Sequence, residues 1–278
     1  MMNNEKNSTE QGFAVRMTDV DFGWTQKRAR PKTVAAQTSN YQVQNPNEGF
    51  RFQIPSFEVK KGERLILVGP SGSGKSTLLG LICGTLVPQA GRVEILGEDL
   101  AQLRSAARDK FRGQHIGIIF QQLNLVPYLS VIENVLLPLQ FSPARMKEVG
   151  NNAAACRSSA ADILDALDMP VEQFGTQKAG TLSIGQQQRV AAARAFIGSP
   201  EIIIADEPTS ALDRSRQVAF LEHLFEQQRQ TDATLLMVSH DETIAEHFDR
   251  VVQLGDICDM AGSEGNDHSL KHNNSEAG

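Results

Sequence analysis

Short, mostly apolar runs alternate with longer amphipathic stretches over most of the chain. The runs have the length of strands and few polar positions, which is typical of strands buried on both faces of a sheet. Because the stretches between them are long enough for crossover helices, the pattern predicts an α/β fold with a mainly parallel sheet. The buried strands are expected at residues 65–68, 115–120, 202–205 and 234–239, with a last strand at 250–254.

The segment before the first buried strand shows partial alternation of apolar and polar residues. Residues 13–24 (FAVRMTDVDFGW) and 50–54 are each expected to form a strand, as is the later segment 91–96 (GRVEIL). Residues 25–49 are polar and carry a basic cluster, so a long hairpin loop is expected there. A solvated loop and a contact site for another molecule both remain open for this segment.

Helical patterns fill residues 122–200 and recur at 214–229. Two helix starts are marked by a serine followed three residues later by Glu or Gln, the capping-box pattern. Gly198 and Pro200 end the second of these helices. The capping boxes are Ser130 with Glu133 and Ser183 with Gln186.

Composition limits the class of protein. A chain of 278 residues with net charge −6 lacks the basic excess of most nucleic-acid binders, so no nucleic-acid partner is expected. The 3 cysteines have no metal-site spacing, which fits a reducing compartment and no disulfide framework. No apolar run approaches the length of a membrane span, and the polar N-terminus lacks an apolar signal core, so a cytoplasmic location is expected. Residues 1–12 and 262–278 are polar and expected to be disordered.

The strongest chemical signal follows the first buried strand. Residues 69–77 read GPSGSGKST, which contains the phosphate-binding pattern G-x-x-x-x-G-K-S between a strand and a helix. Successive backbone N–H groups and the helix N-terminus would hold the phosphates there. Lys75 would neutralise the β- and γ-phosphates, and Ser76 would coordinate Mg²⁺. The nucleotide-binding residues expected here are Gly69, Pro70, Ser71, Gly72, Ser73, Gly74, Lys75, Ser76 and Thr77.

Polar residues follow three other buried strands, and in a parallel sheet ligands bind beyond these carboxyl ends. Gln121 follows 115–120 and could ligate Mg²⁺ and sense the γ-phosphate. Asp206 is expected to bind Mg²⁺, and Glu207 to act as general base on water. His240 could bind the γ-phosphate and orient that water. A solvated glutamine, a solvated acidic pair and a structural histidine are the respective alternatives.

The segment LSIGQ, residues 182–186, points to a second anion site. Ser183 would cap a helix whose N-terminus attracts anions. Since the chain already has a phosphate loop, a second site suggests a dimer in which Ser183 and Gly185 close over ATP held by the other subunit. A plain capped helix remains the alternative.

Over about residues 13–258 the chain resembles the ATP-binding subunits of ABC transporters. The motifs that carry the resemblance follow the family's order and spacing. They are the phosphate loop, Gln121 as the Q-loop residue, LSIGQ with Gln186 as the signature, IIIADEP as Walker B, Ser210–Asp213 as the D-loop and His240 as the switch histidine.

The resemblance implies a P-loop NTPase core, an antiparallel β subdomain and an α-helical subdomain inserted at about 122–200. It also implies ATP and Mg²⁺ as cofactors, a homodimer of ATPase subunits and an integral membrane permease as partner on the inner face of the cell membrane. Trp24 resembles the aromatic residue that stacks on adenine, and Phe22 is its rival.

Within the family, residues 112–139 look like the branch that releases lipoproteins or exports macrolides. A signalling ATPase of the cell-division type, which moves a membrane partner without transport, is the alternative. Soluble ABC proteins of DNA repair or translation need a coiled-coil insertion or two ATPase domains, which this length does not accommodate. An apolar stretch could dock the partner or be buried in the core. Its residues are Leu123, Leu125, Val126, Tyr128 and Leu129.

One residue departs from the family pattern. Ile184 stands where the signature has its first glycine. A β-branched residue can take helical dihedral angles, so the helix is expected to form. The side chain would either crowd the closed dimer or pack harmlessly against its own helical subdomain.

Overall fold

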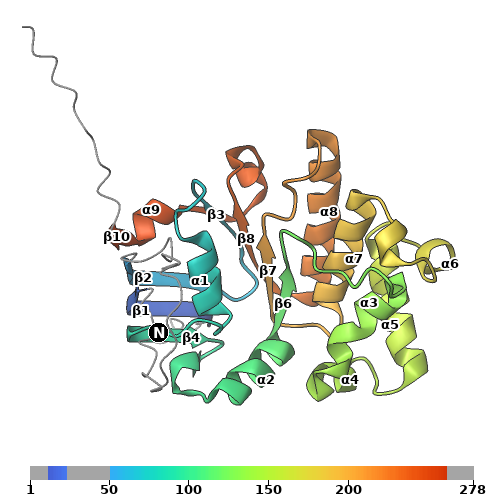
Figure 1. The fold of residues 1–278 in the computed structure, drawn as a ribbon, viewed down its shortest axis with the longest axis horizontal. Coiled ribbons are helices and arrows are strands. Elements are labelled where there is room, and N and C mark those ends of the chain that lie inside the picture. Colours follow the sequence, from blue (N-terminus) through green and yellow to red (C-terminus); the bar gives the residue numbers. More distant parts are fainter. Residues whose placement is uncertain (1–11, 24–50, 262–278) are drawn as a thin grey trace, which may run out of the picture.

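The computed structural model describes residues 12–23 and 51–261. The expected hairpin loop at 25–49, Trp24 and nearly all of the two expected disordered tails lie outside these residues. Figure 1 shows the described chain as two sheets with helices between and beside them.

A five-stranded parallel sheet forms the centre of the fold, as the apolar runs predict. Neighbouring side chains along each strand point to opposite faces, and the structure buries both sets: Leu65 and Leu67 join one core cluster, Ile66 and Val68 the other. In spatial order the strands are β6 (Ile116–Ile119), β7 (Ile202–Asp206), β8 (Thr234–Ser239), β3 (Arg64–Val68) and β9 (Arg250–Gln253).

A five-stranded antiparallel sheet covers one side of the parallel sheet, with α1 (Lys75–Ile82) between them. The expected strands at 13–24, 50–54 and 91–96 all belong to it, so the antiparallel β subdomain is present. Its spatial order is β10 (Asp259–Ala261), β2 (Arg51–Lys60), β1 (Phe13–Gly23), β4 (Ala90–Ile95) and β5 (Glu98–Asp99).

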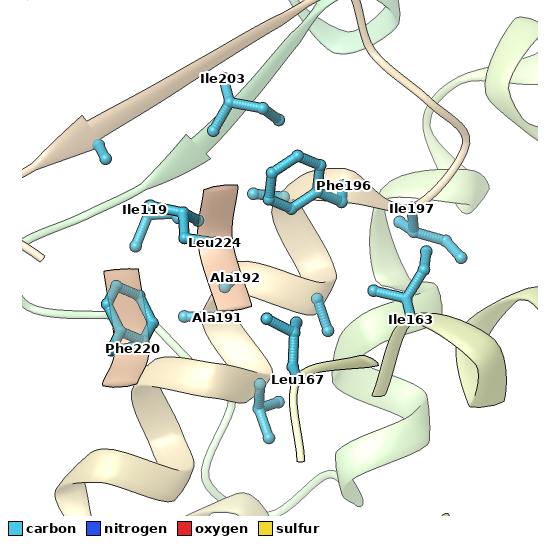
Figure 2. Close-up of a cluster of buried hydrophobic side chains, with 14 of the residues drawn as sticks. Ile119, Ile163, Leu167, Ala191, Ala192, Phe196, Ile197, Ile203, Phe220 and Leu224 are labelled. Carbon is cyan, nitrogen blue, oxygen red and sulfur yellow. The ribbon is translucent and has the colours of Figure 1, made fainter. Parts of the chain in front are cut away.

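Helices cover the other face of the parallel sheet (Figure 1). Figure 2 shows their packing: Phe196 faces the strand residue Ile203, while Phe220 and Leu224 come from a neighbouring helix. Both predicted capping boxes are present. The helices are α3 (Val131–Leu136), α4 (Pro143–Glu148), α5 (Ala153–Ala166), α6 (Val171–Phe174), α7 (Ile184–Phe196) and α8 (Arg214–Thr231), with short 3-10 turns η1 (Leu100–Gln102), η2 (Leu137–Gln140), η3 (Ala179–Thr181) and η4 (Glu242–His247).

The structure differs from the sequence expectation in two regions, before β6 and after residue 253. Helix α2 (Ser105–His115) was not expected, and His115 ends this helix instead of opening β6. The last strand is not 250–254, because Leu254 opens the short helix α9 (Leu254–Ile257) and β10 follows it.

All three cysteines are buried and unbridged. In the described ranges, no helix has the length and apolar character of a membrane span.

Candidate functional site

The phosphate loop connects β3 to α1 and wraps around the end of the Lys75 side chain. The Lys75 Nζ donates hydrogen bonds to the carbonyl oxygens of Gly69, at 2.6 Å, and Pro70, at 3.0 Å. Gly74 has φ 89°, a left-handed conformation that glycine adopts without strain. A Cβ at position 69 would lie 2.9 Å from the Ser73 Oγ, so a side chain there would displace this hydroxyl.

The loop's polar groups fit a phosphate ligand. The buried Ser73 Oγ has no hydrogen-bond partner among the described residues. Helix α1 begins after Gly74 with no side-chain cap and no acidic residue in its first turn, so its N-terminal N–H groups and partial positive charge are available to an anion. Neutral donors, a cation and a helix N-terminus at one loop are the groups that hold phosphates in proteins.

The acidic pair stands at the carboxyl end of β7, close to the phosphate loop. Asp206 is the last residue of β7, and the Glu207 N–H continues the sheet by donating to the Val238 carbonyl at 2.9 Å. The Glu207 Oε1 lies 3.6 Å from the Lys75 Nζ, and both side chains are largely buried. The predicted lysine and the predicted general base are therefore in one cluster.

His240 joins this cluster. It follows β8, and its ring Nδ1 lies 2.9 Å from the Glu207 Oε2, so an Nδ1–H would donate to the carboxylate. The side chain of His240 remains half-exposed. The sequence indicated a role for His240 at the γ-phosphate, whereas the contact in the structure is with Glu207.

The oxygen donors expected to hold Mg²⁺ occupy neighbouring strand ends. Asp206 ends β7 and Gln121 follows the adjacent strand β6, while Ser76 lies exposed in the first turn of α1. Carboxylate, amide and hydroxyl oxygens are ligands that Mg²⁺ accepts, usually alongside water and phosphate. Burial raises the pKa of the Asp206 carboxyl, the Glu207 carboxylate raises it further, and Lys75 lowers it. A divalent cation would favour the ionised form of such a group.

The signature segment stands apart from this cluster. Ser183 Oγ accepts the Gln186 N–H at 3.4 Å, and the Gln186 side chain accepts the Ser183 N–H at 2.9 Å. A Cβ on Gly185 would lie in ordinary contact with Leu212 of the D-loop, at 3.8 Å. Within the described chain, no hydrogen bond or ion pair joins Ser183, Gly185 or Gln186 to Lys75, Glu207 or His240. The role of these three signature residues over a second subunit's ATP stays a prediction.

Phe22 is buried in the core of the antiparallel sheet, so a stacking role would require it to leave that core. Trp24 stays a prediction outside the described residues. The expected docking stretch divides: Leu123 is buried and Leu125 packs against the core, whereas Tyr128 is 74% exposed.

Sequence reasoning missed two buried polar side chains of α7 that contact segments next to the site. Gln188 on α7 donates to the Pro208 carbonyl at 2.8 Å, directly after the acidic pair. Arg194 on α7 donates to the carbonyls of Leu123 and Asn124, at 2.5 and 2.7 Å. A buried position on the inner face of a helix occupied by Gln or Arg is the signal that could have found them.

Comparison with known proteins gives consistent matches. Residues 52–210 match the family described as ABC transporter. The chain is 39% identical over 198 residues to an uncharacterised ABC transporter ATP-binding protein, YbbA, of Escherichia coli K12, covering 70% of this chain and 82% of that one. It is 39% identical over 197 residues to the lipoprotein-releasing system ATP-binding protein LolD of Chromohalobacter salexigens, covering 71% and 79%.

A solved structure is similar over most of the fold. It is the dimeric post-hydrolysis state of the ATP-binding cassette MJ0796 bound to ADP and Pi, with a TM-score of 0.68 and 30% sequence identity. The match covers 86% of this chain and 93% of that chain.

Proposed function

This chain belongs to the ABC transporter family as an ATPase subunit, and we propose that it hydrolyses Mg-ATP to drive a separate membrane permease, most consistently in lipoprotein release or export. The observation that carries the proposal is the cluster of Lys75, Glu207 and His240. It brings together a lysine ammonium, a buried carboxylate and a histidine ring, which supports the proposed roles of Glu207 as base and His240 as the residue that orients it. The similarity to LolD supports transport or release over pure signalling.

Each group has a distinct part in the proposed reaction. The phosphate loop and Lys75 hold the β- and γ-phosphates, with Thr77 and the other loop residues completing the site. Glu207 accepts a proton from the attacking water, and His240 keeps the carboxylate oriented through Nδ1. Ser76, Gln121 and Asp206 are the residues that would hold Mg²⁺, which supplies charge neutralisation on the transferred phosphoryl group when bound.

We propose that two copies close over two ATP molecules. The signature segment of one copy, Ser183 to Gln186, would meet the phosphate loop of the other. The similar MJ0796 cassette is a dimer, which supports this arrangement. The separation of the signature from the Lys75 cluster within one chain agrees with a site completed by a second copy.

The permease would dock beside β6, on the cytoplasmic face of the membrane. A cavity of about 360 Å³ lies there between α2, η2, α4 and α7. Two aromatic side chains at this cavity are exposed, Phe141 at 75% and Phe120 at 39%. Exposed aromatic residues around a concave surface are typical of a protein-binding site.

The test is ATP turnover with and without the permease. We expect weak turnover by the isolated subunit and a higher rate in the purified complex. Lys75→Ala should abolish phosphate release, because the cation that neutralises the phosphoryl group is lost. Lys60→Ala, which removes an exposed lysine of β2, is the matched control and should retain the rate. Turnover near wild type in Lys75→Ala would refute the assignment.

A further inference from the structure

Arg194 is a buried cation near the carbonyl groups that follow Gln121 and Gln122. It lies in the last turn of α7 and is 9% exposed. In the part of the chain that the structure describes, its recorded partners are backbone carbonyls, and no carboxylate forms an ion pair with it. Burial lowers the pKa of its guanidinium. Burying a charge that has no oppositely charged partner costs free energy of folding. The presence of Arg194 at this position therefore suggests that its hydrogen bonds have a function.

The two carbonyls belong to a strained turn. Arg194 Nη2 donates to Leu123 O at 2.5 Å, and Nη1 donates to Asn124 O at 2.7 Å. Leu123 and Asn124 have φ 44° and 48°, so two successive residues other than glycine adopt the left-handed conformation. The two charge-assisted hydrogen bonds hold this turn directly after Gln121 and Gln122.

The position of Arg194 is fixed by close packing against the strand that leads to Gln121. Gly117 on β6 has no room for a side chain, because a Cβ there would lie 2.2 Å from the Ala195 carbonyl oxygen. Figure 2 shows Ala191, Ala192 and Phe196 of the same helix among the buried side chains. Helix α7 therefore cannot shift much against β6 without opening the core.

The same helix also holds the acidic side of the site. Gln188, almost two turns before Arg194, donates to the Pro208 carbonyl, and Pro208 directly follows Glu207. One buried helix thus contacts the segment after Gln121 and the segment after the acidic pair. The pairing of β6 with β7 sets the spacing of the two strand ends, and α7 contacts the segment that follows each of the predicted ligands Gln121 and Asp206.

We propose that Arg194 is a positioning residue that holds Gln121 where it can ligate Mg²⁺ together with Asp206. The inference rests on the proposed function, since it concerns the Mg²⁺ site of the same ATPase. In this proposal Arg194 acts through its carbonyl partners and has no direct role at the nucleotide. It fixes the backbone turn from which the Gln121 side chain is presented.

The first experiment measures the ATPase rate of the purified complex as a function of Mg²⁺ concentration. For Arg194→Gln, we expect the Mg²⁺ concentration for half-maximal rate to rise about 10- to 100-fold, the effect usual for groups that orient metal ligands. Binding of a fluorescent ATP analogue in EDTA should be unchanged, because the phosphate loop is intact. Arg189→Gln is the matched control, because Arg189 is on the same helix but has a different partner. Its Nη1 donates to the Asp168 Oδ2 at 2.8 Å, and this pair does not include a residue of the site.

The second experiment separates positioning from a general structural role. If Arg194 acts through Gln121, the double variant Arg194→Gln with Gln121→Ala should be no worse in Mg²⁺ dependence than the worse single variant. Arg194→Lys keeps the charge but loses the planar fork that reaches both carbonyls, so it should show the same Mg²⁺ shift with a smaller effect on folding. Should Arg194→Gln not fold, Arg194→Lys carries the test.

The outcomes distinguish this inference from the proposed function. A wild-type complex without Mg²⁺-dependent turnover would overturn the proposed function itself. An active wild type would overturn only the role of Arg194 in two cases. One is an unchanged Mg²⁺ dependence in the Arg194 variants, even if they unfold more easily. The other is a set of fully additive effects with Gln121→Ala.

Discussion

The departure at Ile184 allows a prediction in which stability and activity move in opposite directions. Ile184 is the first residue of α7 and is 45% exposed, behind the Ser183 cap. Half of the side chain is thus covered by its own chain, and the other half faces outward at the segment expected to meet the second subunit. Glycine at this position would clear that outer surface without removing the capping box.

The magnitudes for Ile184→Gly follow from this exposure. Full burial of an isoleucine stabilises a fold by about 1.5–3 kcal/mol, so losing a half-buried one should cost about 1 kcal/mol. Glycine adds about 0.5 kcal/mol of helix penalty relative to isoleucine. In the closed dimer, relief of overpacking should contribute about 1–3 kcal/mol in the opposite direction. Each 1.4 kcal/mol is worth about tenfold in the population of the closed state.

The assay pairs two measurements on Ile184→Gly. The urea midpoint should fall, while the ATP concentration for half-maximal rate of the complex should fall by about tenfold or the rate should rise. Val251→Gly is the matched control, because Val251 is also a β-branched residue at 45% exposure but lies on β9. It should lose stability with no change in ATP dependence. An unchanged or slower Ile184→Gly enzyme would refute the crowding and indicate neutral packing.

Two further predictions concern the acidic pair. Glu207→Gln should bind ATP, lose about 10²–10⁴-fold in turnover and elute at dimer mass with Mg-ATP on gel filtration, because the shape is kept and the base is lost; unimpaired hydrolysis by a monomer would contradict the assignment. Asp206→Asn should abolish Mg-ATPase yet raise the urea midpoint at pH 8. The reason is that the pKa of Asp206 is raised in the folded state, so its contribution to the free energy of unfolding is present below the unfolded pKa and is lost as pH rises through the folded pKa. Asparagine stays neutral at pH 8 and avoids this loss. The gain should shrink as the pH falls, and a lower midpoint at pH 8 would be inconsistent with this reasoning.

The strand ends could be predicted from the sequence because parallel strands bring their carboxyl ends to one edge. That rule predicted that Gln121 and Asp206 lie at the same edge of the sheet, and the structure adds that their strands, β6 and β7, are direct neighbours. It could not show that Glu207 contacts both Lys75 and His240. Those contacts depend on strand order and on side-chain directions, which no local pattern encodes.

The features that the sequence did not predict share a physical cause, which is that no local pattern of apolar residues marks them. Helix α2 buries none of its residues, so it has no apolar stripe for a periodicity argument to detect. Strand β10 pairs only three residues with β2, and its pairing depends on chain separated from it by some two hundred residues. The sequence drew no attention to Arg194, because burial of a charged residue is set by the neighbouring strand and turn rather than by its own segment.

The backbone conformation of Glu207 bears on its proposed role as the catalytic base. Its φ is 45°, a left-handed value that costs a residue with a side chain about 1–2 kcal/mol. Glycine would adopt this conformation without strain but would carry no carboxylate. The Glu207 N–H still bonds to Val238, so the sheet holds the residue in place while the left-handed turn redirects the chain after Asp206. Strain retained beside a phosphate-loop lysine and a histidine is the pattern expected of a catalytic position.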